Sequence, residues 1–212
     1  AISYSTQALN CCKTILDASS IERMRFKEVI ASSQKAMEQY DDALVHYEPI
    51  YYGLNVQIKS LQQKKKQDKQ QNDNDNQENE EEKKNDNDDT NNNIKEDYSL
   101  QELLVWKGDI TYNIAMIYNS QRNFQKAAKF AKECCVIRNI YNNNSSKQIL
   151  ALMLVSVIVS SPQIAEYKLA LDNLEKAKKI INNNDSNANK KDKDKKKDDM
   201  KQYLPQVQKL SG

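Results

Sequence analysis

Apolar residues recur at helical spacing along much of the chain, and residues 111–137 show the pattern most clearly. Ile114, Ala115 and Tyr118 share one face of a helix, because side chains three and four positions apart lie together on its surface. Residues 122–123 then fill a turn. The facing stripe of a second helix consists of Phe124, Ala127, Ala131, Cys134 and Ile137. Alanines in both stripes let the two helices approach closely, so the segment predicts a packed helical pair.

The same spacing predicts an all-α protein. No segment alternates apolar and polar residues between turn signals, and the chain has only 3 Gly and 3 Pro. Pro162 is expected in a turn, whereas Pro49 should kink the third helix or end it, with a restart near Gly53. Helices are expected near residues 3–17, 21–38, 41–61, 99–120, 124–140, 147–160 and 165–181, with a further short one at 200–210.

The pair at 111–137 resembles a tetratricopeptide repeat (TPR), a helix–turn–helix unit of about 34 residues. Ile114, Ala115 and Tyr118 fall on the Leu, Gly and Tyr positions of the first helix. Thr111 stands where the family has Trp, and Ala131 replaces the second-helix aromatic. The second-helix positions are occupied by Phe124, Ala127, Ala131 and Cys134.

Further copies of the second-helix signature follow the same register. The residues equivalent to Ala127 are Ala8, Ala43 and Ala170, and the four alanines are separated by 35, 84 and 43 positions in chain order. The resemblance implies a TPR-like solenoid of antiparallel helix pairs. Its expected repeat-packing residues are Ala8, Tyr40, Ala43, Tyr47, Ile114, Ala115, Tyr118, Phe124, Ala127, Ala131, Cys134, Tyr167, Ala170, Leu174 and Ala177.

Two polar tracts interrupt the helical pattern. Residues 62–97 are almost entirely Gln, Asn, Lys, Asp and Glu, with 12 acidic and 7 basic side chains. Ordering a residue costs about 1 to 2 kcal/mol of backbone entropy, which so little apolar surface cannot offset, so we expect disorder. The predicted organisation is N-terminal helical repeats at 1–61, a disordered insertion at 62–97, TPR-like repeats at 98–181, a disordered linker at 182–201, and a short segment at 202–212 that is the candidate start of a further helix.

The apolar run from Ile149 to Val159 is too short for a membrane span, which needs about 20 apolar residues. We expect a helix buried between neighbours and no membrane partner.

The cysteines form two adjacent pairs, Cys11-Cys12 and Cys134-Cys135, which suit packed, reduced thiols better than a metal site. Reduced thiols favour a cytoplasmic location, with the nucleus as the alternative.

The sequence offers little for catalysis. His46 is the only histidine, and no nucleophile elbow, zinc-binding helix motif or phosphate-binding glycine loop is present. The formal net charge of +2 gives no strong electrostatic case for nucleic acid. We therefore expect a non-enzymatic chain without a cofactor, a metal or a small-molecule substrate.

A protein partner is the favoured hypothesis. In a solenoid the first helix of each pair lines the binding face. The candidate partner-binding residues are Asn113, Met116, Ile117 and Gln121 at that position, with Tyr51 and Tyr52 near the expected kink. They would dock a helix or an extended peptide of another protein.

The order of elements is also similar to that of the TPR subunits of Ccr/Not-type mRNA deadenylase complexes. That resemblance implies a complex subunit that acts in mRNA turnover by holding other subunits. The alternative is a nucleic-acid-associated helical repeat that uses the lysine-rich tracts at 64–66 and 187–197. Interleaved aspartates weaken it, because phosphate binding needs a basic stripe with few competing acids. Direct contact with nucleic acid is therefore not expected.

Overall fold

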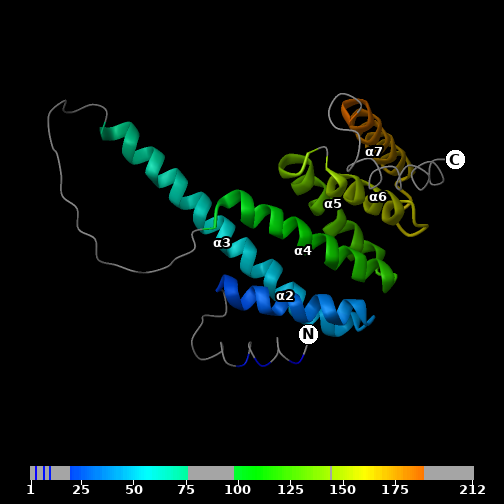
Figure 1. Ribbon diagram of the computed structural model, residues 1–212, viewed down its shortest axis with the longest axis horizontal. Coiled ribbons are helices and arrows are strands. Elements are labelled where there is room, and N and C mark those ends of the chain that lie inside the picture. Colours follow the sequence, from blue (N-terminus) through cyan, green and yellow to red (C-terminus); the bar gives the residue numbers. More distant parts are fainter. Residues whose placement is uncertain are drawn as a thin grey trace.

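The computed structural model of the chain describes residues 20–75, 98–143 and 145–188, together with residues 3, 7 and 10, and for 68–75 and 185–188 it describes the backbone only. The described residues contain helices and no strand, which confirms the all-α class. The elements are α2 (Ile21–Ala36), α3 (Tyr40–Asp75), α4 (Leu100–Ser120), α5 (Phe124–Tyr141), α6 (Ser146–Val159) and α7 (Tyr167–Ala188) (Figure 1).

The helices pack mainly against their neighbours in the chain. The pairs α2 with α3, α4 with α5, and α6 with α7 are each joined by a turn, and α3 also packs on α4 and α5 on α6. A smaller contact joins α4 to α6. Figure 1 shows the resulting succession from α2 at one end to α7 at the other.

The turns inside the three pairs share one backbone feature. A residue with positive φ stands two positions before each second helix: Glu38 at 59°, Arg122 at 58° and Ala165 at 54°. In the first two turns the residue after the positive-φ residue donates a backbone hydrogen bond to the end of the preceding helix. Gln39 N–H donates to the Gln34 carbonyl at 2.9 Å, and Asn123 N–H donates to the Tyr118 carbonyl at 2.8 Å. The third turn is longer and contains Pro162, as predicted.

The second helices also begin alike. Each starts at an aromatic residue, and the alanine three positions later is buried: Ala43 and Ala127 are fully covered and Ala170 is 5% exposed. The N–H of each alanine donates to the carbonyl of the residue that precedes the helix, at 3.0, 2.9 and 3.1 Å respectively.

The three first helices share a serine cap. The side chains of Ser20, Ser99 and Ser145 each accept a hydrogen bond from the backbone N–H three residues on. At Ser99 the bond is reciprocal, because the Glu102 carboxylate accepts from the Ser99 N–H at 2.8 Å. The serine cap at the start of the first helix and the positive-φ turn after it therefore recur in all three pairs, although the pairs differ in most other residues.

Helix α3 differs from the prediction in two ways. It continues to Asp75, past the predicted end near residue 61, and it passes Pro49 without ending. Lysine and glutamine propagate a helix well, so a helix nucleated by the packed part continues into the polar tract. Gly53 lies where α3 meets α2, and a Cβ there would stand 2.6 Å from the Met24 sulfur. The C-terminal part of α3 projects beyond the other helices (Figure 1).

Several expectations fall on residues outside the described ranges. They are most of the helix at 3–17 with Ala8 and the Cys11-Cys12 pair, the insertion from residue 76 to 97, most of the linker at 182–201, and the segment at 202–212.

The core consists of two apolar clusters connected through α6. The larger one spans α2 to α6 and part of α7, and the smaller one lies between α6 and α7. Val155 and Ile158 of α6 belong to the first cluster, whereas Ile149 and Leu152 belong to the second. The run predicted to be a buried helix is buried along nearly its whole length. No helix of the described residues is long and apolar enough to cross a membrane.

Candidate interaction surface

Most of the expected repeat-packing residues lie in the core. The buried ones are Ala43, Tyr47, Ile114, Ala115, Tyr118, Ala127, Ala131, Cys134, Ala170, Leu174 and Ala177. Tyr40 and Phe124 are half-buried, and Tyr167 differs from its expectation because 57% of it is exposed. The turn that precedes Tyr167 is longer than the turns before Tyr40 and Phe124.

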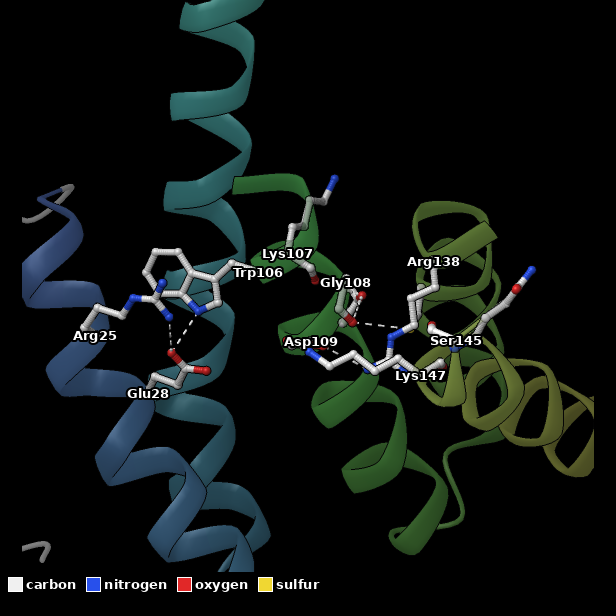
Figure 2. A network of polar contacts seen from close by, with 12 residues as sticks. Arg25, Glu28, Trp106, Lys107, Gly108, Asp109, Arg138, Ser145 and Lys147 are labelled. Carbon is white, nitrogen blue, oxygen red and sulfur yellow. Dashed lines mark hydrogen bonds and ion pairs between the residues drawn. The ribbon is translucent and has the colours of Figure 1, made fainter. Parts of the chain in front are cut away.

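Helices α2 and α4 lie side by side and run in the same direction. Trp106 donates its indole N–H to Glu28 at 2.8 Å, and Lys35 donates to the side-chain amide oxygen of Asn113 at 2.6 Å. Both bonds join residues 78 positions apart, so the two helices stay in register over two turns. The Arg25 guanidinium lies 3.7 Å from the centre of the Trp106 ring (Figure 2).

A second cluster of polar side chains connects α4 to α5 and α6 (Figure 2). Asp109 accepts from Arg138 at 3.0 Å and from Lys147 at 2.6 Å. Arg138, whose side chain is 5% exposed, also donates to the Lys147 carbonyl at 2.8 Å and lies 4.5 Å from the centre of the Tyr112 ring. A buried guanidinium needs such partners, because an uncompensated charge is costly in the interior. This cluster therefore holds the second helix pair, α4 and α5, against α6 of the third pair.

One face of α4 carries a stripe of half-exposed residues. Val105, Asp109, Tyr112 and Met116 follow spacings of four, three and four, so they share one face of the helix. On α2, which runs beside α4, Arg25 and Val29 are exposed, and Arg25 lies over Trp106 of α4. We define the first-helix surface as Arg25, Val29, Val105, Asp109, Tyr112 and Met116.

The four partner candidates on α4 have different environments. Met116 is half-exposed and belongs to the first-helix surface, whereas Ile117 is 1% exposed and packs in the core. Asn113 is held at the edge by Lys35, whose pKa burial lowers. Gln121 caps α4 and donates to Asp41 at 2.7 Å, away from the stripe.

The two tyrosine candidates lie on α3. Tyr51 is half-buried, donates to Glu133 at 2.9 Å and meets the edge of Phe130 at 5.3 Å between ring centres. Its neighbour Tyr52 is 61% exposed. Tyr51 therefore joins α3 to α5, and of the two only Tyr52 presents most of its ring to solvent. Val105, Asp109 and Tyr112 were not among the candidates, although their spacing from Met116 is visible in the sequence.

The cysteine and histidine environments favour packing. Cys134 is fully buried, its thiol donates to the Gly108 carbonyl at 3.3 Å, and burial raises its pKa to about 11. Burial also raises the pKa of the half-buried Cys135. His46 is half-buried, and burial followed by the charge of Lys27 lowers its pKa. Among the described residues no three His, Cys, Asp or Glu side chains are grouped as metal ligands.

Comparison of the sequence with family models, with curated proteins and with solved structures finds no match in any of the three. The first-helix surface is therefore interpreted from its own geometry and chemistry. It is apolar along Val29, Val105 and Met116, whereas Arg25 is paired with Glu28 and Asp109 with Arg138 and Lys147.

Proposed function

We propose that the chain is a non-catalytic scaffold, a TPR-like segment of a larger assembly that binds other proteins along the first-helix surface. The observation that supports this most is the threefold recurrence of one design: a serine-capped first helix, a turn with positive φ, and a second helix with a buried alanine at its fourth position. Stacked pairs of this kind present their first helices as one extended surface.

The partner that suits this surface is an amphipathic helix or an extended peptide. The stripe from Val105 to Met116 is about 16 Å long at 1.5 Å per residue, or three helical turns. Val29, Val105 and Met116 would contact apolar side chains of the partner, as anchor residues do in grooves that bind helices. Arg25 and Asp109 are already paired within the chain, so the apolar side chains would supply most of the contact.

Within this class, we propose a subunit of a Ccr/Not-type deadenylase assembly that acts in mRNA turnover in the cytoplasm. The support is the order of elements: a pair with a long second helix, a polar low-complexity tract, a second pair, and an apolar helix that opens the third.

The test is affinity purification of the tagged protein from its native cells, followed by mass spectrometry with and without nuclease. We expect a defined set of proteins that survives nuclease, with deadenylase subunits among them. The variant Met116→Asp should lose that set, whereas Gln101→Asp, an exposed change near the start of the same helix, should retain it. Recovery of only nuclease-sensitive RNA-binding proteins would contradict the scaffold and favour the lysine-rich tracts. Full retention by a folded Met116→Asp variant would exclude this surface.

A further inference from the structure

The outer face of α3 exposes apolar side chains that no described helix covers. Val45 is 67% exposed, and Tyr52 and Val56 are each 61% exposed. Pro49 lies between them and is also exposed. On the opposite side of the same turns, Tyr47 and the other inward residues are fully buried against α2 and α4.

These residues follow the spacing of a coiled-coil seam. The exposed positions on this face lie three, four, three, four and three residues apart, which is the heptad pattern that keeps a stripe against a partner helix. We define the α3 seam as Asp42, Val45, Pro49, Tyr52, Val56 and Lys59. An apolar stripe with this period is suited to a second helix that lies along α3.

The seam is symmetric about a point midway between residues 50 and 51. Val45 and Val56 are equally far from this midpoint, and so are Pro49 and Tyr52. Asp42 and Lys59 are also equally far from it and carry opposite charges. A two-fold axis through the midpoint would place an antiparallel copy so that every apolar residue meets an apolar residue and each Asp42 meets a Lys59. The seam is thus complementary to itself.

We propose that the α3 seam binds a second copy of this chain, with the two α3 helices antiparallel. The part of α3 beyond Leu61 then runs past the partner's α2–α3 turn. Because the seam offers only four apolar side chains from each copy, we expect a weak and reversible dimer.

Sedimentation equilibrium of the full chain over a series of concentrations tests the dimer. The mass should rise from the 24.5 kDa of the monomer toward twice that value. The double variant Val45→Asp, Val56→Asp should stay monomeric, because four carboxylates would meet in the apolar seam. Val136→Asp, a change at an equally exposed valine on α5, should dimerise like the wild type. A wild-type chain that stays monomeric throughout, or equal dimerisation of all three proteins, would overturn the proposal.

Exchange of the end charges tests the antiparallel geometry. Asp42→Lys alone and Lys59→Asp alone should each weaken self-association about tenfold at low salt, because like charges then meet at both ends. A mixture of the two single variants should form a heterodimer with attractive pairs at both ends, and the chain with both substitutions should dimerise again. Circular dichroism confirms that each variant folds. Failure of both the mixture and the double variant to associate would refute the antiparallel pairing.

Discussion

At the scale of single residues, the alanines at the helix crossings decide how closely the pairs approach. Ala127 and Ala115 are both fully covered and belong to the same apolar cluster. Close packing leaves no space for added carbons, so a larger side chain must displace a helix or adopt a strained rotamer. The crossing is thus the most sensitive point of each pair.

Ala127→Leu should lower the free energy of unfolding by about 1 to 3 kcal/mol. Gln125→Leu is the matched control, because it introduces the same side chain at an exposed position of the same helix. Urea denaturation of the two variants and the wild type measures the difference. If Ala127→Leu were as stable as the control, the space between the two helices at Ala127 would be larger than the structure shows.

The single histidine provides a probe of the α2–α3 pair. Burial and the charge of Lys27 lower the pKa of His46, and Asp42 opposes the shift only in part. An NMR titration should therefore place its midpoint below the ordinary value of about 6.5. Because the folded-state pKa is depressed, the stabilisation is present above pH 6.5 and is lost as the pH falls through the folded pKa. His46→Gln should flatten this part of the stability profile, and a midpoint above 6.5 would contradict the burial.

Residue spacing also shows what the sequence could predict of the surface. The repeat register named Met116 and Ile117 together, but Met116 is half-exposed and Ile117 next to it is buried. A helix turns about 100° per residue, so adjacent residues seldom share a face. Which neighbour faces outward depends on where α2 and α5 pack, and that information lies in contacts between distant residues.

At the scale of elements, the backbone conformation of the turns recurs from pair to pair as regularly as the helices do. Arg122 has a positive φ of 58°, a conformation that glycine adopts without steric cost and that branched residues resist. The same conformation recurs at Glu38 and Ala165, although none of the three is a glycine. The hydrogen bonds that close the helices therefore outweigh the local strain.

Arg122→Gly should keep or slightly raise the thermal midpoint, because the conformation becomes unstrained. Arg122→Val should lower the free energy of unfolding by about 1 to 2 kcal/mol, because its branched carbon clashes in the left-handed region. Differential scanning calorimetry compares the two. A more stable valine variant would mean that the turn is not held in this conformation.

The elements also show where sequence reasoning succeeded and where it did not. The bounds of α4 and α5 follow from strong apolar periodicity and a serine or asparagine cap, and they were predicted within a residue or two. The extension of α3 to Asp75 was not predicted. The polar composition of this tract indicates that it cannot form a core, but it does not indicate whether a helix continues there without core contacts. Pro49 was expected to kink the helix or to end it, yet α3 continues past it, and Pro49 lies on the exposed face.

At the scale of the whole molecule, stability should be distributed along the series of pairs. Each described helix packs chiefly on the elements before and after it, so the middle helices have neighbours on both sides and the outer ones do not. Native-state hydrogen exchange should show the slowest amides in α4, α5 and α6 and faster exchange toward α2 and α7. Equal protection from α2 to α7 would indicate one cooperative globule.

The most direct test of the scaffold compares hydrogen exchange of the chain alone with exchange in the assembly recovered from cells. The account predicts added protection in α2 and α4, over the stretches that carry Val29 and residues 105–116, and persistence of that protection after nuclease treatment. Added protection confined to the lysine-rich tracts and removed by nuclease would contradict it. So would an assembly that leaves exchange in α2 and α4 unchanged.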